Sequence, residues 1–424
     1  LRPAFSLEHL HSHPYIVHLV AFRTSLLREV GGWNESLLIS QDYDLIVRVA
    51  ERARKIVHVP EILYRWRNHG TSAGHARQGQ VVEASLGLLR QHLERTGRPG
   101  RVEEGASFNF YSVRYALGEG LRVGIVIPTK NHGDLLRQCI DSLRATIGKV
   151  AYDILVVDHE SDDPGTLDYL ASLSGQARVV RFSGPFNFAA INNFAVKQLG
   201  AGYSHYLLCN NDIEAYEHGW LERMVELAQQ PDAGIVGAML FYPDRKTIQH
   251  AGVCIGMSRG AEHYGKFLRY PEDTSGLSRE LLSMTREVAA VTAACMLVRG
   301  DAWEEVGGFD EKIAVGYGDV DLCLRVVESG RRVLFCASAR LIHHESFTRG
   351  TSEFDPHPVD TSAFREKWKR LLEAGDPYYS PAFSLNSRRW EIRRPLPCQV
   401  EVRRRVVERD PEGRRNRIAF SPSI

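Results

Sequence analysis

The chain has 424 residues, of which 53 are Lys or Arg and 52 are Asp or Glu, so its near-neutral balance gives no reason to expect a nucleic-acid partner. Its hydrophobic content of 43% is ordinary for a globular protein, and its length suits two or three domains. The longest apolar runs, such as 123–128 and 154–157, fall far short of the roughly 20 residues that a membrane-spanning helix needs, so we expect no membrane span.

Seven cysteines are scattered along the chain, and no two of them form a CxxC pair. A disulfide framework or a zinc site would need tighter grouping, so this pattern favours a reducing compartment. The sequence begins at Leu1 and shows no signal peptide. We therefore expect a cytoplasmic protein.

Residues 20–74 and 295–350 carry the same motifs in the same order. The first copy contains Val30-Gly31-Gly32-Trp33, Asp42, Asp44 and His69, and the second contains Val306-Gly307-Gly308-Phe309, Asp319, Asp321 and His343-His344. In both copies an acidic pair opens a predicted helix, and a histidine follows about one strand later. Such a repeat has to be recognised before a fold is assigned, and this layout suits a catalytic carboxylate with a late metal ligand.

Only the second copy is preceded by a sequence typical of a parallel sheet. We therefore interpret residues 1–98 as the C-terminal portion of a truncated unit, which ends in an amphipathic helix at 80–98. Residues 99–121, which begin with a Gly-, Arg- and Glu-rich stretch, are the expected linker. Residues 122–375 are the complete unit, and residues 376–424 are a basic C-terminal extension.

The complete unit shows alternating strand and helix patterns. Strands are predicted at 123–128, 152–158, 177–182 and 206–209, and helices are predicted after Asp134, a candidate N-cap, and at 187–199. This alternation predicts an α/β fold with a parallel, doubly wound sheet, in which ligands bind beyond the carboxyl ends of the strands. The polar residues at these ends, which we expect to converge on one crevice, are Thr129, Asn131, Asp158 and Asn210-Asn211-Asp212.

Four carboxylates are candidates for chemistry. Asp212 ends a strand where a hard divalent cation bridging a diphosphate could bind, although an Asp in a turn or a helix cap is the alternative. Asp158 could accept a hydrogen bond from a nucleobase, or it could merely begin a turn. Either Asp319 or Asp321 could be a general base for a sugar hydroxyl, while the alternative is that both acids only stabilise the helix N-terminus.

His343 and His344 follow a predicted strand at 341–342. Neutral imidazole is a good ligand for manganese-like cations, and Arg340 nearby could neutralise phosphate. An ordinary surface histidine is the alternative.

Together these motifs resemble the inverting family 2 glycosyltransferases, and in particular bacterial multi-unit enzymes described as rhamnosyltransferase-like or O-antigen glycosyltransferases. The resemblance covers essentially the whole chain. It implies an α/β fold of the GT-A type, with a Rossmann-like, mostly parallel sheet flanked by helices. The matching segments are Val126-Ile127-Pro128-Thr129-Lys130-Asn131, Val156-Val157-Asp158, Asn187-Phe188 through Asn192-Asn193, Asn210-Asn211-Asp212, Gly318-Asp319-Val320-Asp321 and His343-His344.

The resemblance implies metal-dependent transfer of a hexose, with inversion, from a UDP-, dTDP- or GDP-linked donor to a glycan or lipid-linked glycan acceptor. Asp319 would be the general base, and Asp212 and His343 would hold Mn²⁺ or Mg²⁺. Asp321 and His344 would have acceptor or secondary roles. The implied donor-binding residues are Pro128, Thr129, Asn131, Asp158, Asn187, Asn193, Asn210, Asn211 and Asp212, and the first-unit counterparts are Asp42 and His69.

The sequence departs from the family pattern at two places. The first Asp of the DxD metal motif is replaced by Asn210, and the usual Glu-Asp pair is Gly318-Asp319. Because the terminal carboxylate is kept in both motifs, we expect activity to be retained in the second unit. The first unit lacks donor-binding strands, so we expect that it cannot hold a nucleotide sugar.

Two other functions fit parts of the sequence. A nucleotidyltransferase would normally show a Gly-rich basic loop after the first strand, whereas residues 128–133 contain one Gly and one Lys. A catalytically silent glycan-binding module is the other alternative, and the retained acidic residues argue against it.

The arginine-rich extension predicts peripheral contact with an anionic membrane surface, with a solvated tail as its alternative.

Overall fold

The computed structural model describes residues 2–61, 63–64, 77–258, 260–344 and 355–393, together with the backbone of strands Arg404–Arg409 and Asn416–Ser421. The complete unit is built on a ten-stranded mixed sheet, counted over these residues, with the order β13-β15-β9-β14-β7-β4-β5-β6; β10 pairs with β9 and β8 pairs with β15. The parallel strands are β4 (Arg122–Thr129), β5 (Ala151–Asp158), β6 (Arg178–Arg181), β7 (His205–Cys209), β9 (Ala233–Phe241) and β15 (Arg332–His343). The antiparallel strands are β8 (Ile213–Ala215), β10 (Ile248–His250), β13 (Arg286–Glu287) and β14 (Cys295–Arg299). The expected mostly parallel sheet is therefore confirmed.

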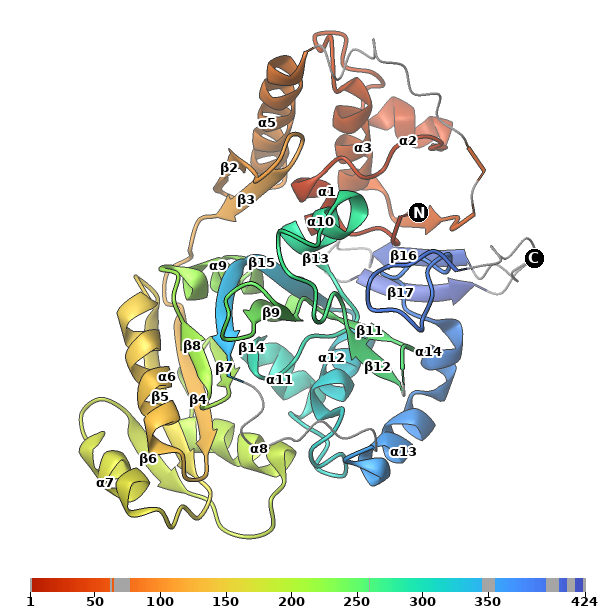
Figure 1. Cartoon of the computed structure of the whole chain (residues 1–424). Helices are drawn as coiled ribbons and strands as arrows, with labels where there is room; N and C mark the ends of the chain where they lie inside the picture. Colours follow the sequence, from red (N-terminus) through yellow and green to blue (C-terminus); the bar gives the residue numbers. More distant parts are fainter. Residues whose placement is uncertain are drawn as a thin grey trace.

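Helices cover both faces of this sheet (Figure 1). The helices of this unit are α6 (Gly133–Thr146), α7 (Pro164–Ser172), α8 (Phe188–Leu199), α9 (Trp220–Ala228), α10 (Gly276–Ser283), α11 (Gly300–Val306), α12 (Gly318–Glu328), α13 (Pro358–Lys367) and α14 (Lys369–Ala374). Apolar residues of α6, α7 and α9 share one buried cluster with Ile125 and Ile127 of β4, whereas α8, α11 and α12 share a second cluster with Val126. Alternate residues of β4 thus face opposite layers, as the period of a strand requires. A separate small hairpin is formed by β11 (Val253–Ile255) and β12 (Ala261–His263).

Two details of the first strand and helix differ from the sequence prediction. Pro128 does not stop β4, which continues to Thr129. Asp134 is not the N-cap of α6, because the helix begins at Gly133. His132 holds the N-cap position, and its side chain makes no capping hydrogen bond. Asn131 and His132 both have left-handed backbones, with φ of 57° and 55°, so the chain turns sharply between β4 and α6.

The first unit consists of α1 (Leu7–Ser12), α2 (Thr24–Glu29), α3 (Gln41–Arg52), β1 (Lys55–His58) and α5 (Gln78–Arg95). Its closing helix α5 matches the prediction at 80–98 apart from the ends. The expected linker at 99–121 contains a β-hairpin, in which β2 (Gly100–Glu104) pairs with β3 (Tyr111–Tyr115). Val102 and Tyr111 of this hairpin are buried in the same cluster as α5 and the large sheet, so the segment is packed against both units.

The internal repeat is visible in matching hydrogen bonds. Arg325 of α12 donates to Asp321, Val306 O and Gly308 O at 2.8, 2.7 and 2.6 Å. The corresponding bonds from Arg48 of α3 reach Asp44, Val30 O and Gly32 O at 2.6, 2.6 and 2.8 Å. The sequence repeat therefore corresponds to the same helix–turn–helix arrangement in α2–α3 and α11–α12.

The two copies differ in what covers the Gly-Gly turn. Phe309 is only 4% exposed and packs edge-on against Phe188 of α8, at a ring distance of 5.9 Å. Its counterpart Trp33 is 58% exposed. The first copy thus lacks, among the described residues, the layer that α8 provides in the second.

A buried ionic cluster joins α1 to the large sheet. Arg332 at the start of β15 contacts Asp232, Glu287 and Glu8 at 2.6, 2.8 and 3.2 Å. Burial lowers the affinity of Arg332 for its proton, but the three carboxylates outweigh this and raise its pKa well above the ordinary value. Breaking such a cluster by removing one partner would leave buried charge uncompensated.

The C-terminal region contacts both parts of the chain: residues 388–390 pack against the second unit, and a later strand pairs with the first unit. Trp390 stacks on Tyr264 with ring centroids 5.8 Å apart, and Arg388 pairs with Glu262. Further along, β16 (Arg404–Arg409) pairs with both β17 (Asn416–Ser421) and β1 of the first unit (Figure 1). The extension is therefore not a wholly solvated tail.

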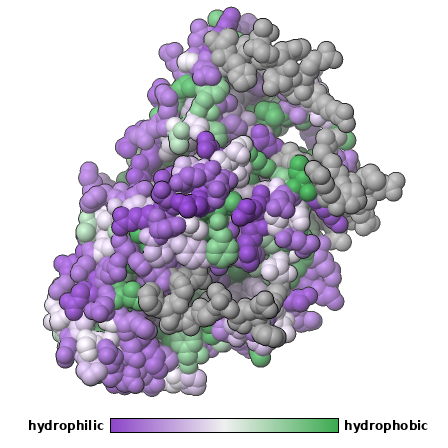
Figure 2. All heavy atoms as spheres, viewed as in Figure 1, coloured by the Kyte–Doolittle hydropathy of each residue, from purple (hydrophilic) through white to green (hydrophobic). Residues whose placement is uncertain are grey.

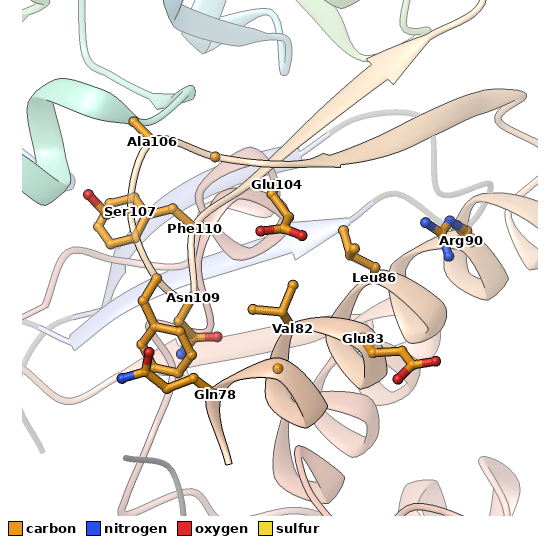
Figure 3. A pocket seen from close by; sticks show the side chains of 13 residues that line it. Gln78, Val82, Glu83, Leu86, Arg90, Glu104, Ala106, Ser107, Asn109 and Phe110 are labelled. Carbon is orange, nitrogen blue, oxygen red and sulfur yellow. The ribbon is translucent and has the colours of Figure 1, made fainter. Parts of the chain in front are cut away.

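A groove of about 600 Å³ lies between α5 and the tip of the β2–β3 hairpin. Figure 3 shows Val82, Leu86 and Arg90 on α5 facing Glu104 and Phe110 of the hairpin. None of the predicted site residues lines it, so the groove is separate from the site described below.

On the face shown in Figure 2, hydrophilic residues predominate and hydrophobic ones are scattered. In the described part of the chain, every helix is too short or too polar to cross a bilayer.

Candidate active site

Residues from the ends of three strands meet at one edge of the large sheet. Asn211, which follows β7, donates from Nδ2 to Thr129 Oγ1 at the end of β4, at 2.9 Å. Thr129 in turn lies opposite Asp158 in the parallel β4–β5 pairing. Because β4 lies between β5 and β7, the three predicted polar segments are brought together, as carboxyl ends of parallel strands should be.

The loop after β5 is held by hydrogen bonds to Asp158 and Asn131, two of the residues predicted to bind the donor. Asp158 is 6% exposed and accepts a hydrogen bond from Ser161 N at 3.0 Å. Asn131 accepts from the amides of Asp162 and Asp163, both at 3.0 Å. Asp158 thus begins a turn, which was one of its two alternatives, while its place at the strand end is also the one that base recognition requires.

Asp212 and His343 are brought together by a short strand pairing. β8 pairs antiparallel with the end of β15, with Ile213 opposite His343. This places Asp212 Oδ1 3.2 Å from His343 Nε2, and Asn210 Nδ2 lies 3.4 Å from the same nitrogen. Burial raises the pKa of Asp212, but the hydrogen bond and charge of His343, a backbone hydrogen bond and the charge of His344 together bring this pKa below its ordinary value. A side chain from residue 343 therefore completes a site that begins at residue 210.

The Asp212–His343 pair fits a divalent cation. Oδ1 of Asp212 is buried, and His343 Nε2 is its polar neighbour among the described residues. Its separation of 3.2 Å from His343 Nε2 is close to the roughly 3.0 Å between neighbouring ligand atoms of an octahedral cation with bonds of about 2.1 Å. The described residues contain no cluster of three or more His, Cys, Asp or Glu side chains that could hold a metal. The protein would therefore supply two ligands, and phosphate oxygens and water would supply the others.

His344 belongs to a different set of contacts. Its Nε2 pairs with Glu214 Oε2 at 2.8 Å, and Gln138 donates to the same oxygen at 2.7 Å. Arg245 contacts the other Glu214 oxygen at 3.1 Å. His344 thus lies in a polar cluster beside the Asp212–His343 pair, and the metal role of His343 stays a prediction.

The two acids of α12 have different environments. Asp321 is fully buried and accepts from Arg325, Trp368 Nε1 and Lys367 Nζ at 2.8, 2.8 and 2.7 Å. Asp319 accepts from the backbone amides of Ala293 and Val320 at 3.1 and 2.9 Å, and among the described residues it has no cationic partner. Neither acid is the N-cap, since Tyr317 holds that position with a left-handed backbone. Asp321 is therefore a structural residue, and Asp319 is the one with lone pairs left for a substrate.

Asn187 and Asn193 support the loop before α12. Asn187 caps α8 by accepting from Ala190 N at 2.9 Å and also donates to Glu311 O at 3.0 Å. Asn193 exchanges two hydrogen bonds with the backbone of Phe309, at 3.0 and 2.9 Å. Both side chains thus fix α8 against this loop, a role that the sequence did not indicate.

The first-unit counterparts are only partly described. Asp42 accepts from Tyr43 N at 2.9 Å, just as Asp319 accepts from Val320 N. His69 lies outside the described residues.

Comparison with known proteins agrees with this architecture. The model of the glycosyl transferase family 2 matches residues 124–282, which extend from β4 into α10. O-antigen biosynthesis protein RfbC of Myxococcus xanthus is 34% identical over 430 residues, which make up 98% of this chain and 32% of that protein. This chain therefore spans about a third of that relative's length.

Two further relatives cover smaller parts of the chain. An N-acetylglucosaminyl-diphospho-decaprenol L-rhamnosyltransferase of Mycobacterium tuberculosis is 26% identical over 53% of this chain and 77% of its own length. A mannosyltransferase of Pyrobaculum calidifontis, solved in complex with GDP-Man and Mn²⁺, overlaps 54% of this chain and 58% of its own with 15% identity and a TM-score of 0.39. The similarity to glycosyl transferase family 2 therefore lies in residues 124–282, which supply most of β4 and all of β5, β6, β7 and β9 of the large sheet.

Proposed function

We propose that residues 122–375 transfer a sugar, with inversion, from a nucleotide-diphosphate donor to a glycan acceptor. The match of residues 124–282 to the glycosyl transferase family 2 model supports the reaction class. The observation that carries the residue assignment is the contrast at α12, where Asp321 is neutralised by two cations and also accepts from Trp368, whereas Asp319 is held by two backbone amides.

Asp319 acts as the general base of this reaction. Amide hydrogen bonds fix the direction of its carboxylate without cancelling its charge, which suits a group that must accept a proton from an acceptor hydroxyl. The hydroxyl proton passes to Asp319 as the oxygen attacks the anomeric carbon. The bond from that carbon to the diphosphate oxygen breaks, and the nucleoside diphosphate leaves from the opposite face, so the configuration inverts.

The donor lies across the carboxyl ends of β4, β5 and β7. Asp158 contacts the base, and residues 128–131 and 210–212 line the path of the ribose and diphosphate. Asp212 and His343 would hold a Mn²⁺ or Mg²⁺ ion, which would offset the charge of the departing diphosphate. The 3.2 Å separation of the buried Asp212 Oδ1 from His343 Nε2 supports this assignment.

The biological role that fits is assembly of a bacterial surface polysaccharide or lipopolysaccharide. The support is the 34% identity to an O-antigen biosynthesis protein along nearly the whole chain. The donor base, the sugar and the linkage depend on the loops around the site.

A product analysis tests the proposal. The chain is incubated with Mn²⁺, a glycan acceptor panel, and UDP-, dTDP- and GDP-linked sugars, and the released nucleotide and the anomeric configuration of the product are measured. We expect a nucleoside diphosphate and an inverted glycoside. Release of a sugar 1-phosphate, with the nucleotidyl group transferred to the acceptor, would indicate a nucleotidyltransferase, and a retained configuration would contradict the direct displacement.

A further inference from the structure

The segment Thr292–Ala294 connects three parts of the proposed site. Ala293 N donates to Asp319 Oδ2 at 3.1 Å, and Ala294 O accepts from Asn210 N at 3.0 Å. On its other side, Thr292 N donates to His250 Nε2 at 3.4 Å. The placement of Asp319 relative to the Asn210–Asp212 loop therefore depends on this segment, and His250 is one of its anchors.

The partners of His250 assign its tautomer. His250 ends β10, is fully buried, and accepts from Gly252 N as well as Thr292 N through Nε2. A nitrogen that accepts two amide protons carries none itself, so the proton of the neutral ring is on Nδ1. Burial, assisted by the neighbouring His263 and Arg286, keeps the pKa of His250 well below its ordinary value, which agrees with a neutral ring.

His263 fixes this tautomer from the β11–β12 hairpin. Its Nδ1 lies 3.0 Å from His250 Nδ1, and the two rings meet edge to face with centroids 4.9 Å apart. Since His250 carries a proton on Nδ1, it donates and His263 accepts. The hydrogen bonds thus run from the hairpin through His250 to the backbone that holds Asp319.

We propose that His250, oriented by His263, is a positioning residue that fixes the Thr292–Ala294 segment and through it the direction of the Asp319 carboxylate. The proposal rests on the proposed role of Asp319 as the base. A misplacement of about 1 Å at a reacting group can lower a rate about 100-fold, so loss of this anchor should appear in kcat. Donor binding should change little, because His250 contacts none of the proposed donor-binding side chains.

The test compares three variants of the whole chain. His250→Leu removes both polar contacts, and His250→Gln keeps an oxygen that can accept from Thr292 N. His205→Leu is the matched control, since His205 is equally buried at 3% exposure but lies at the opposite end of β7 from Asn210. The readouts are kcat and KM with the donor found by the product analysis, the Kd of UDP, dTDP and GDP with Mn²⁺, and the thermal midpoint.

We expect kcat to fall about 10- to 100-fold in His250→Leu, with KM and nucleotide affinity within about twofold, and to recover partly in His250→Gln. His205→Leu should keep the wild-type kcat even if its thermal midpoint falls. A wild-type kcat in His250→Leu, or an equal loss in His205→Leu, would overturn the positioning role.

Asp319→Asn separates this proposal from the function on which it rests. An inactive Asp319→Asn together with a fully active His250→Leu would leave the base assignment standing and remove the role of His250. An active Asp319→Asn would remove both. Nitrogen-15 NMR of histidine-labelled protein gives a readout independent of activity, and a proton on Nε2 of His250 would contradict the hydrogen-bond direction inferred here.

Discussion

Replacing Asp321 by Asn should destabilise the fold far more than replacing Asp319 by Asn. Asp321 is fully buried and neutralises Arg325 and Lys367 while accepting from Trp368. An Asn side chain keeps the volume but removes the charge, and its amide group would face the guanidinium donors of Arg325. Lys367 keeps its second partner Asp310 at 2.8 Å, so Arg325 bears most of the loss.

The expected cost is about 3 kcal/mol for Asp321→Asn, the lower end for breaking a buried ion pair. Asp319 loses only part of two backbone hydrogen bonds, so Asp319→Asn should cost about 1 kcal/mol or less. At roughly 2 °C for each kcal/mol in a large domain, these values correspond to about 6 °C and about 2 °C in the thermal midpoint. Differential scanning fluorimetry of the two variants measures the contrast. Equal midpoints would refute the division of roles between the two acids.

Three further predictions concern metal, acid and membrane. Asp212→Asn and His343→Ala should each weaken Mn²⁺-dependent binding of UDP, dTDP or GDP at least tenfold by calorimetry, and EDTA should abolish the difference from the wild type. Burial lowers the pKa of His9 and of His92 to about 4, so the unfolded chain takes up protons first as the pH falls below 6.5. The free energy of unfolding should therefore be about 2 kcal/mol lower per histidine at pH 5 than at pH 7. The urea midpoint measures this change, and the fall should be smaller in His9→Phe. Deleting 394–424, which keeps the packed Trp390, should reduce co-sedimentation with anionic vesicles if the arginine-rich extension contacts membranes; unchanged binding would exclude that contact.

The sequence predicted the strands and the residues at their ends because both depend on local pattern. Apolar runs define β4, β5 and β7, and polar residues such as Thr129 and Asp158 follow them directly. Neighbouring parallel strands then necessarily bring these residues to one edge. The pairing of Asp212 with His343 could be expected only from the resemblance, since it depends on β8 and β15, which are more than a hundred residues apart in the chain.

The roles that depend on long-range contacts could not be predicted. The four-residue spacing of Asp321 and Arg325 is a helical ion-pair signal that indicates a structural role for Asp321, but its bond to Trp368 comes from a distant helix. His250 has no local signal, because its partner Thr292 is 42 residues away and its tautomer depends on His263. Gly and charged residues dominate the start of the hairpin at 100–115, and this local composition predicts a linker, whereas the pairing of β2 with β3 depends on residues about ten positions apart.

The central claim is that Asp319 removes the acceptor proton. The most direct measurement is the kcat of Asp319→Asn together with the affinity for UDP, dTDP and GDP in Mn²⁺, each compared with the wild type. We predict that kcat falls by about 10²- to 10⁴-fold, the usual contribution of a general base, while nucleotide affinity stays within about twofold. Turnover within tenfold of the wild type in a folded Asp319→Asn variant would contradict the account.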